Sequence, residues 1–397
     1  MAKKAKEDKF LTQDDFEATP QDLDGIFGDD TPYRALTTEL WSDIPFWCPT
    51  GASSLDFAIG GYVRGRKGGV PHRRAMEIWG PESSGKSVLL DHIIKNWCKL
   101  YGVVLLADSE NSHEEYRLLQ IGMGPYLNRI RYIHKPVKIG DKTVFVNDYT
   151  LEEFFDLTEK GVAKIREKNT SIPILIALDS LAYLATDAQK KAQAEGERMS
   201  MKLQLDMSRV LSMRFDTFCA ALTKNNCALV IVNQFRQKPD ATFKDPDYSP
   251  GGNTKNHAFS IRVKLDAGRR IYPSEDPTRE HEGDDAVGIM CSFEVNKNKV
   301  APPFRRGRFA LYFDDRGIFP EETFAHLILD RKKFNYCDDF EKSGSWYSWK
   351  GERLGQGVND MIRTFVTNPE IMAEMEGALF LDSMQCKAEE EREQNEE

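Results

Sequence analysis

Three runs of consecutive apolar residues stand out in the pattern of hydrophobic and polar positions along the chain. They cover Gly102–Asp108, Ile174–Ser180 and Ala228–Gln234, and each run ends in polar side chains. Apolar runs of this length, without alternation, are typical of strands buried on both faces, as in a parallel sheet. A shorter run over residues 76–79, apolar except for Glu77, meets Gly80. We therefore expect an α/β fold whose central, mostly parallel sheet is flanked by helices.

Helical periodicity occupies much of the chain between these runs. Apolar residues recur at helical spacing from Val88 to Ile94 and from Lys202 to Leu222. Thr150-Leu151-Glu152-Glu153 is a capping box, which predicts a helix to about residue 168. Further strands are predicted over residues 259–265, 288–295 and 309–313.

The two ends of the chain differ in character from its middle. Residues 1–45 are polar and rich in aspartate, and residues 386–397 form an acidic tail without core-building residues. The N-terminal segment is either a disordered arm or an oligomerisation element that docks Phe27 or its neighbours on another subunit. Helical stretches flank a predicted hairpin at 344–352. We therefore expect an arm over 1–45, a core over 46–317, a small C-terminal α/β domain over 318–385 and a disordered tail.

One stretch carries a complete phosphate-binding motif. Gly80-Pro81-Glu82-Ser83-Ser84-Gly85-Lys86-Ser87 fits the pattern G-x-x-x-x-G-K-[ST] at every fixed position. The glycines permit a close approach that a Cβ would prevent, so that successive N–H groups can face phosphate oxygens. Lys86 supplies a positive charge, and Ser87 supplies a hydroxyl for Mg²⁺. The alternative is a Gly/Ser-rich loop before an ordinary helix, but the flanking strand and helix patterns favour the phosphate loop.

Carboxylates follow two of the predicted strands. Asp179 ends an apolar strand downstream of the phosphate loop, which is the Walker B arrangement, and it would hold Mg²⁺ through water. The alternative is an aspartate that only caps the following turn. Asp108 and Glu110 follow the first long run, at the edge where α/β sheets place their ligand chemistry. Asp108 is a candidate to support the metal site.

A loop that mixes cations with aromatic residues follows the third run. Residues 235–253 include Arg236, Lys238 and Phe243 and end in Pro250-Gly251-Gly252-Asn253. Cations neutralise phosphates, and aromatic or apolar side chains stack on bases or insert between them. By composition alone, a nucleic-acid loop and an ordinary surface loop both remain open.

Composition narrows the class of protein. The chain has 397 residues, 40% hydrophobic and 29% charged, as expected for a soluble protein of about two domains. No apolar run approaches the roughly 20 residues of a membrane span, and the N-terminus lacks a secretory signal. The seven cysteines include no C-x-x-C pair, so we expect reduced thiols in a cytoplasmic protein. The net charge of −9 does not exclude a nucleic-acid partner, because much of the acid lies at the two ends.

Taken together, the motifs resemble the RecA family of DNA strand-exchange ATPases. The resemblance spans roughly residues 50–380. Its motifs are GPESSGKS at 80–87, DSE at 108–110, LDS at 178–180, NQFRQK at 233–238, GGN at 251–253, KNKVAPPF at 297–304 and WYSWKGERLGQG at 346–357. The last two lie outside the ATPase core that helicases share, and they are more specific than a phosphate loop. The divergent N-terminus and the insertions near 62–74 and 268–285 favour a bacteriophage-encoded or otherwise diverged member.

The resemblance implies a RecA-type ATPase core that uses ATP and Mg²⁺. Such a protein forms helical filaments of its own copies on single-stranded DNA, pairs that strand with homologous double-stranded DNA and exchanges strands. ATP would bind between subunits, and DNA would stimulate its hydrolysis.

The resemblance also implies roles for individual residues. Glu110 would activate the attacking water, and Gln234 would sense the γ-phosphate and relay its presence to the DNA loop. Lys297 and Lys299 would reach the ATP of the neighbouring subunit. Tyr116 lies near the family's adenine contact, one residue short of the family's spacing.

Two DNA-binding loops follow from the same resemblance. Arg236, Gly251, Gly252 and Asn253 match the second loop, in which Lys238 and Phe243 also lie. The first loop, at about residues 188–201, aligns poorly. Either Met199 or Met201 would insert between bases there, and Ser208 is the best anchored neighbour.

We therefore expect a DNA-dependent ATPase with recombinase function. A ring-forming ATPase of the same core type, such as a replicative helicase, is one alternative, but the KNKVAPPF and WYSWKGERLGQG matches argue against it. A recombination accessory protein that does not hydrolyse ATP is the other, and the presence of Glu110 argues against it.

Overall fold

The computed structural model describes residues 44–60, 68–100, 102–140, 142–198, 200–237, 247–276, 284–332 and 339–378. These residues all belong to one compact unit. The N-terminal arm, apart from Ile44 and Pro45, and the acidic tail lie outside the described residues. The domain boundaries that we placed at 45, 317 and 385 therefore stay predictions.

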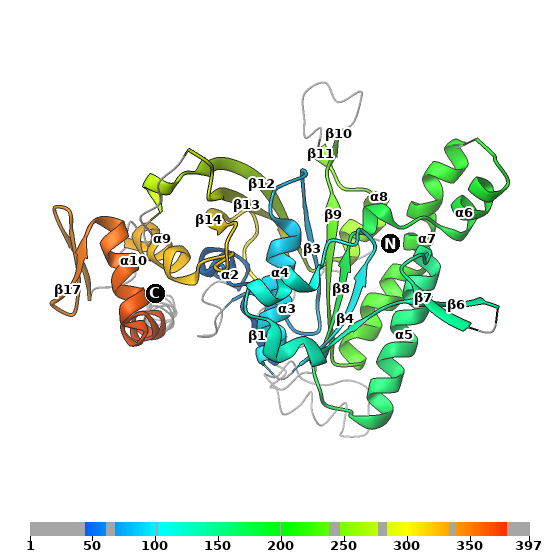
Figure 1. Cartoon of the computed structure of the whole chain (residues 1–397), viewed down its shortest axis with the longest axis horizontal. Helices are drawn as coiled ribbons and strands as arrows, with labels where there is room; N and C mark the ends of the chain where they lie inside the picture. Colours follow the sequence, from blue (N-terminus) through cyan, green and yellow to red (C-terminus); the bar gives the residue numbers. More distant parts are fainter. Residues whose placement is uncertain are drawn as a thin grey trace, which may run out of the picture. The chain divides into compact units, whose positions relative to one another are not determined.

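A sheet of eight strands forms the centre of the described structure, as Figure 1 shows. In spatial order the strands are β14 (Arg306–Tyr312), β13 (Gly288–Asn298), β12 (Ile261–Ile271), β3 (Ala75–Gly80), β9 (Cys227–Gln234), β8 (Ile174–Asp179), β4 (Val103–Asp108) and β5 (Ile130–Tyr132). Neighbours from β12 to β5 pair in parallel, whereas β13 and β14 continue the sheet as antiparallel strands. This arrangement confirms the expected α/β fold with a mostly parallel sheet.

The central strands are buried on both faces, which explains their uninterrupted apolar runs. In β4, Val104 and Leu106 join the hydrophobic core on one face of the sheet, and Leu105 and Ala107 join the core on the other. Helix α3 (Lys86–Lys99) contributes to the first core. Helices α5 (Leu151–Lys168) and α7 (Met201–Lys224) contribute to the second core (Figure 1). Each buried aliphatic side chain contributes about 1.5–3 kcal/mol, so two-sided burial strongly favours this layered arrangement.

Capping residues determine where two of the helices begin. The predicted capping box at Thr150 and Glu153 is present at the start of α5, with both reciprocal hydrogen bonds formed. A second box, formed by Thr186 and Gln189, opens helix α6 (Asp187–Ala194). The expected first DNA loop at 188–201 therefore begins with a helix, because this capping box favours helix formation.

The remaining elements of the core are short. The helical ones are α2 (Ser53–Gly60), α4 (Glu115–Gln120), α8 (Gly252–Ala258), η3 (Gly124–Arg129), η4 (Leu181–Tyr183) and η5 (Pro273–Glu275). The strands are β1 (Trp47–Cys48), β2 (Val70–Pro71), β6 (Lys135–Ile139), β7 (Lys142–Val146), β10 (Arg236–Gln237) and β11 (Asp247–Tyr248). None of the helices formed by the described residues combines the length and the apolar character needed to cross a bilayer.

A separate hydrophobic core lies toward the C-terminus. The predicted hairpin is part of a three-stranded sheet of β15 (Phe340–Ser343), β16 (Trp346–Trp349) and β17 (Glu352–Gln356). Helices α9 (Pro320–Lys332) and α10 (Gly357–Thr367) pack with it, and Phe57 of α2 belongs to the same cluster.

The strand order brings the polar strand ends to one edge of the sheet. Asp108 at the end of β4 is in register with Asp179 at the end of β8. Gly80 at the end of β3 is in register with Gln234 at the end of β9. Carboxyl ends of parallel strands are where α/β sheets bind ligands, so the site is expected at this edge.

Candidate active site

The phosphate loop connects β3 directly to α3, and its glycines occupy positions that other residues could not. A Cβ on Gly80 would lie 2.0 Å from the carbonyl oxygen of Leu265 in β12. Gly85 has φ +83°, and a Cβ there would lie 2.7 Å from Cδ1 of Leu311. Within the loop, the hydroxyl of Ser84 donates to the carbonyl of Pro81 at 2.8 Å. The structure therefore supports the loop geometry that the motif predicts.

Lys86 begins α3 and extends back over this loop. Its ammonium donates to the carbonyl of Pro81 at 2.6 Å. Burial lowers the pKa of Lys86, while Asp179, Glu110 and Glu82 oppose that shift. The cation therefore lies in a partly desolvated position, where its attraction to phosphate oxygens is strengthened.

A cavity of about 630 Å³ opens beside the phosphate loop. Its lining includes most of the residues that we assigned to nucleotide binding and hydrolysis, namely Glu82, Ser83, Gly85, Lys86, Ser87, Glu110, Asp179 and Gln234. The volume falls within the range of small-molecule sites. The structure thus brings four separate segments of the chain to a single cavity.

Glu110 lies at the junction of β4, β8 and β9. Its Oε1 accepts a hydrogen bond from the hydroxyl of Ser180 and a longer one, at 3.5 Å, from Nε2 of Gln234. Burial raises the pKa of Glu110, and the charge of Asp179 adds to this effect. A carboxylate with a raised pKa is a stronger base, which suits a group that accepts a proton from water.

Asp179 is fully buried at the end of β8 and has one oxygen without a partner. Its Oδ1 forms no hydrogen bond with any of the described residues, whereas Oδ2 accepts one from the hydroxyl of Ser112 at 3.2 Å. Burial alone would raise the pKa of Asp179, but His113, Ser87 and Ser112 outweigh burial and lower it. A buried carboxylate oxygen without a partner beside the hydroxyl of Ser87 fits a Mg²⁺ ion that keeps several water ligands. Within the described ranges no three His, Cys, Asp or Glu side chains are grouped to hold a metal, so the nucleotide and water would supply the other ligands.

Asp108 accepts hydrogen bonds from the loop that follows β4, and the metal support that we expected of it stays a prediction. Its two carboxylate oxygens accept the backbone N–H groups of Ser112 and His113 at 3.0 and 3.1 Å. Asp108 therefore fixes the loop that carries Glu110, because a carboxylate that accepts two N–H groups holds the backbone firmly.

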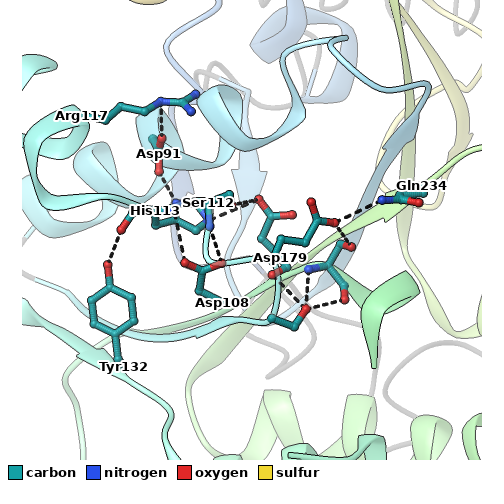
Figure 2. A network of polar contacts seen from close by, with 11 residues as sticks. Asp91, Asp108, Ser112, His113, Arg117, Tyr132, Asp179 and Gln234 are labelled. Carbon is teal, nitrogen blue, oxygen red and sulfur yellow. Dashed lines mark hydrogen bonds and ion pairs between the residues drawn. The ribbon is translucent and has the colours of Figure 1, made fainter. Parts of the chain in front are cut away.

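Sequence analysis missed a buried chain of charges behind this site, which Figure 2 shows. Nδ1 of His113 lies 2.5 Å from Oδ1 of Asp91, and Nε2 of His113 lies 3.2 Å from Oδ2 of Asp179. Nε of Arg117 lies 3.5 Å from the other oxygen of Asp91. The signal for this feature was present in the sequence, since Asp91 interrupts the apolar pattern of the helix that follows the phosphate loop.

Tyr116 lies on the helix that borders the cavity. Its side chain is 76% exposed, whereas Arg117 and Gln120 of the same helix line the cavity. An exposed ring could contact a nucleotide held between two copies of the chain, so the assignment of Tyr116 to the adenine stays a prediction.

Lys297 and Lys299 lie near the end of β13 and do not line the cavity of their own chain. Both ammonium groups donate to the carbonyl of His257 at the end of α8, at 2.9 Å each. Burial, together with the charge of Lys299, lowers the pKa of Lys297 to about 8. Because neither lysine lines the cavity of its own chain, both could serve the site of a neighbouring copy, and this role stays a prediction.

The described parts of the two predicted DNA loops meet at one place. Gly252 has φ +76°, and a Cβ on it would lie 2.8 Å from Oγ of Ser208 on α7. Met201 begins α7 with a side chain that is 78% exposed. Arg236 belongs to β10, Gly251 caps α8 and Asn253 lies in α8. Met199, Lys238 and Phe243 lie outside the described residues, so their assignment stays a prediction.

Comparison with known proteins places this geometry in a family. The chain matches the RecA N-terminal domain over residues 20–124 and 156–318 and the RecA C-terminal domain over residues 337–380. It is 32% identical over 354 residues to Protein RecA of Geobacter metallireducens, covering 89% of this chain and 90% of that protein. It is 31% identical over 347 residues to Protein RecA of Bordetella avium, covering 87% of this chain and 84% of that protein.

Proposed function

This chain belongs to the RecA family, and we propose that it is an ATP-dependent recombinase that forms filaments on single-stranded DNA. It would pair the bound strand with a homologous duplex and exchange strands, and DNA would stimulate its hydrolysis of ATP to ADP and phosphate. The family supports recombinase function, ATP binding and DNA binding. The filament and the hydrolysis are our proposals for this chain.

The residues of the cavity have distinct tasks in this proposal. The N–H groups of residues 82–87 and the ammonium of Lys86 hold the phosphates, and Ser87 and Asp179 hold Mg²⁺ with its water shell. When bound, Mg²⁺ neutralises charge on the phosphate oxygens. Glu110 orients the attacking water and accepts its proton.

The observation that carries the proposal is the contact between Glu110 and Gln234. Nε2 of Gln234 lies 3.5 Å from Oε1 of Glu110, and both side chains line the cavity. Gln234 is also the last residue of β9, and the chain continues from it into the second DNA loop. A change of contact at the γ-phosphate position would therefore act directly on the start of that loop. The nucleotide site and the DNA loop are coupled if the contacts of Gln234 differ between the states with and without the γ-phosphate.

Lys297 and Lys299 would complete the site of a neighbouring copy. In the single chain they bind the carbonyl end of α8, whose first residue is Gly252 of the second DNA loop. If a neighbouring nucleotide draws these lysines away, α8 loses three hydrogen bonds at the end opposite the loop, since Lys297 also donates to the carbonyl of Asn256. Cations supplied by another subunit would make hydrolysis depend on assembly, as arginine fingers do elsewhere.

The decisive experiment is an ATPase assay with and without single-stranded DNA. We expect stimulation by DNA for the wild-type protein and loss of turnover with retained ATP and DNA binding for Glu110→Gln. Glu114→Gln, in the same loop but exposed, serves as the matched control and should retain turnover. No hydrolysis under either condition would favour an accessory protein. Closed rings in electron microscopy, without filaments on DNA, would favour a helicase-like ATPase.

A further inference from the structure

A single imidazole lies between two buried carboxylates behind the nucleotide cavity. The side chain of His113 is 0% exposed, and those of Asp91 and Asp179 are each 1% exposed. The ring nitrogens divide the contacts between them, with Nδ1 at 2.5 Å from Asp91 and Nε2 at 3.2 Å from Asp179 (Figure 2). The contact with Asp91 is a hydrogen bond, whereas the contact with Asp179 is an ion-pair contact, since Nε2 forms no hydrogen bond with the described residues.

The two buried carboxylates each have a basic group beside them. Asp91 lies between the imidazole of His113 and Nε of Arg117, which is 3.5 Å away, and Asp179 lies on the other side of the imidazole. Buried carboxylates are tolerated when they are paired with basic groups in this way.

The backbone of His113 is held as firmly as its ring. Its N–H donates to Asp108 at 3.1 Å, and its carbonyl accepts the hydroxyl of Tyr132 at 3.0 Å. Both Asp108 and Tyr132 end strands of the central sheet. The imidazole is therefore fixed to the sheet on one side and to α3, through Asp91, on the other.

This position connects the three elements on which the site depends. Asp91 lies on α3, the helix that begins with Lys86. His113 lies on the loop that carries Glu110, and Asp179 ends β8. Of the two oxygens of Asp179, His113 and Ser112 contact Oδ2, whereas Oδ1 has no hydrogen-bond partner in the described part of the chain.

We propose that His113 is a positioning residue that holds Asp179 by Oδ2, keeps Oδ1 available for the nucleotide-bound cation, and aligns the Glu110 loop with α3. The inference deepens the proposed function and depends on it for the identity of the ligand. A role limited to stability would require only that the buried charges be balanced. The positioning role also requires that Mg²⁺ strengthen nucleotide binding less when the imidazole of His113 is removed.

Paired substitutions separate these two roles. His113→Leu leaves Asp91 and Asp179 without their shared partner, so we expect a lower urea midpoint and weaker nucleotide binding. The double variant Asp91→Leu, His113→Leu replaces one ion pair with two apolar side chains. We expect its urea midpoint to return most of the way to the wild-type value. His113→Gln keeps a donor that can reach one carboxylate and should give an intermediate result.

The readout is the binding of a fluorescent ATP analogue, measured once with Mg²⁺ and once with EDTA. We expect the wild-type protein to bind the analogue more tightly with Mg²⁺ than with EDTA. In the double variant the ratio of these two affinities should be at least about ten-fold smaller. Its affinity in EDTA should stay within about two-fold of that of the wild-type protein. The same Mg²⁺ enhancement in the double variant and the wild type would overturn the positioning role. Because binding is measured without turnover, this result is independent of the DNA-stimulated ATPase assay that tests the proposed function.

A second measurement uses the protein without nucleotide. We expect a downfield imidazole N–H proton resonance from the hydrogen bond between His113 and Asp91 in the NMR spectrum of the wild-type protein, and its loss in Asp91→Leu. Absence of this signal in the wild-type protein would contradict an imidazole fixed by Asp91.

Discussion

The ammonium of Lys255 lies 2.7 Å from Oε1 of Glu77, and both side chains are 0% exposed. Glu77 lies in β3, which leads into the phosphate loop, and Lys255 lies in α8, which follows the second DNA loop. Asn233 donates to the same Oε1 at 2.9 Å and to the carbonyl of Pro250 at 3.0 Å. Burial would raise the pKa of Glu77, but Lys255 and Arg262 outweigh burial and lower it. The two ends of the second loop are thereby fastened to the strand that precedes the phosphate loop.

Lys255→Met should destabilise the protein by about 1–3 kcal/mol, because it removes one buried partner of Glu77 while Arg262 remains paired with that carboxylate at 2.6 Å. Urea unfolding at neutral pH measures the change. Lys350→Met is a suitable control, since Lys350 pairs with Glu374 at a half-exposed surface position and its loss should cost no more than about 1 kcal/mol. Equal costs for the two variants would contradict the role of the buried pair.

Lys86→Ala should abolish nucleotide-dependent binding to single-stranded DNA. Lys86 lines the cavity, and its ammonium donates to the carbonyl of Pro81 in the phosphate loop, so the substitution removes the positive charge beside that loop. Fluorescence anisotropy of a labelled strand, with and without ATP, measures the effect. Lys99→Ala, at the exposed end of the same helix, should behave like wild type. Normal filament assembly of Lys86→Ala with ATP would refute the assignment.

Gly252→Ala should weaken binding to single-stranded DNA, because the added Cβ would lie 2.8 Å from Oγ of Ser208 and separate the two loop regions. Gly122→Ala is the matched control. It has a similar φ of +79° and no atom within 4 Å of the added Cβ, so it should cost only the backbone strain of about 1–2 kcal/mol. DNA binding that is reduced equally in both variants would show that backbone strain, rather than the contact with Ser208, is responsible.

The free energy of unfolding should decrease as the pH is lowered, and part of this decrease should come from His92. Burial lowers the pKa of His92 to about 3, and its Nε2 accepts the N–H of Ile318 at 3.0 Å. A histidine in an unfolded chain has a pKa of about 6.5, so between these values the unfolded state binds more protons than the folded state. The free energy of unfolding should therefore decrease below about pH 6.5, by up to about 1.4 kcal/mol per pH unit for this group.

His92→Gln provides the comparison for this effect, since its amide oxygen can still accept the N–H of Ile318 and does not titrate. Urea unfolding from pH 7.5 to 4.5 should give a shallower acid slope for the variant than for the wild type. Parallel curves over the whole range would mean that His92 does not contribute.

Much of the candidate site was predictable because its signals are local. A phosphate loop needs two glycines, a lysine and a hydroxyl at fixed spacing, and a strand buried on both faces needs an unbroken apolar run. The direction of one side chain on a short helix depends on where that helix begins, so the role of Tyr116 stays a prediction. The contacts of Asp108 could not be predicted either, since they are made with backbone N–H groups of the next loop.

The sequence by itself determined the α/β class, the phosphate loop, the strand-end carboxylates and the family, since these depend on residues close together along the chain. Tertiary structure alone decided which distant charges meet. Asp91 and His113 are 22 positions apart, and Glu77 and Lys255 are 178 apart. Strand order and helix packing set their distances, and the strength of an interaction between buried charges depends on that distance and on the exclusion of water. No local pattern of residues records either quantity.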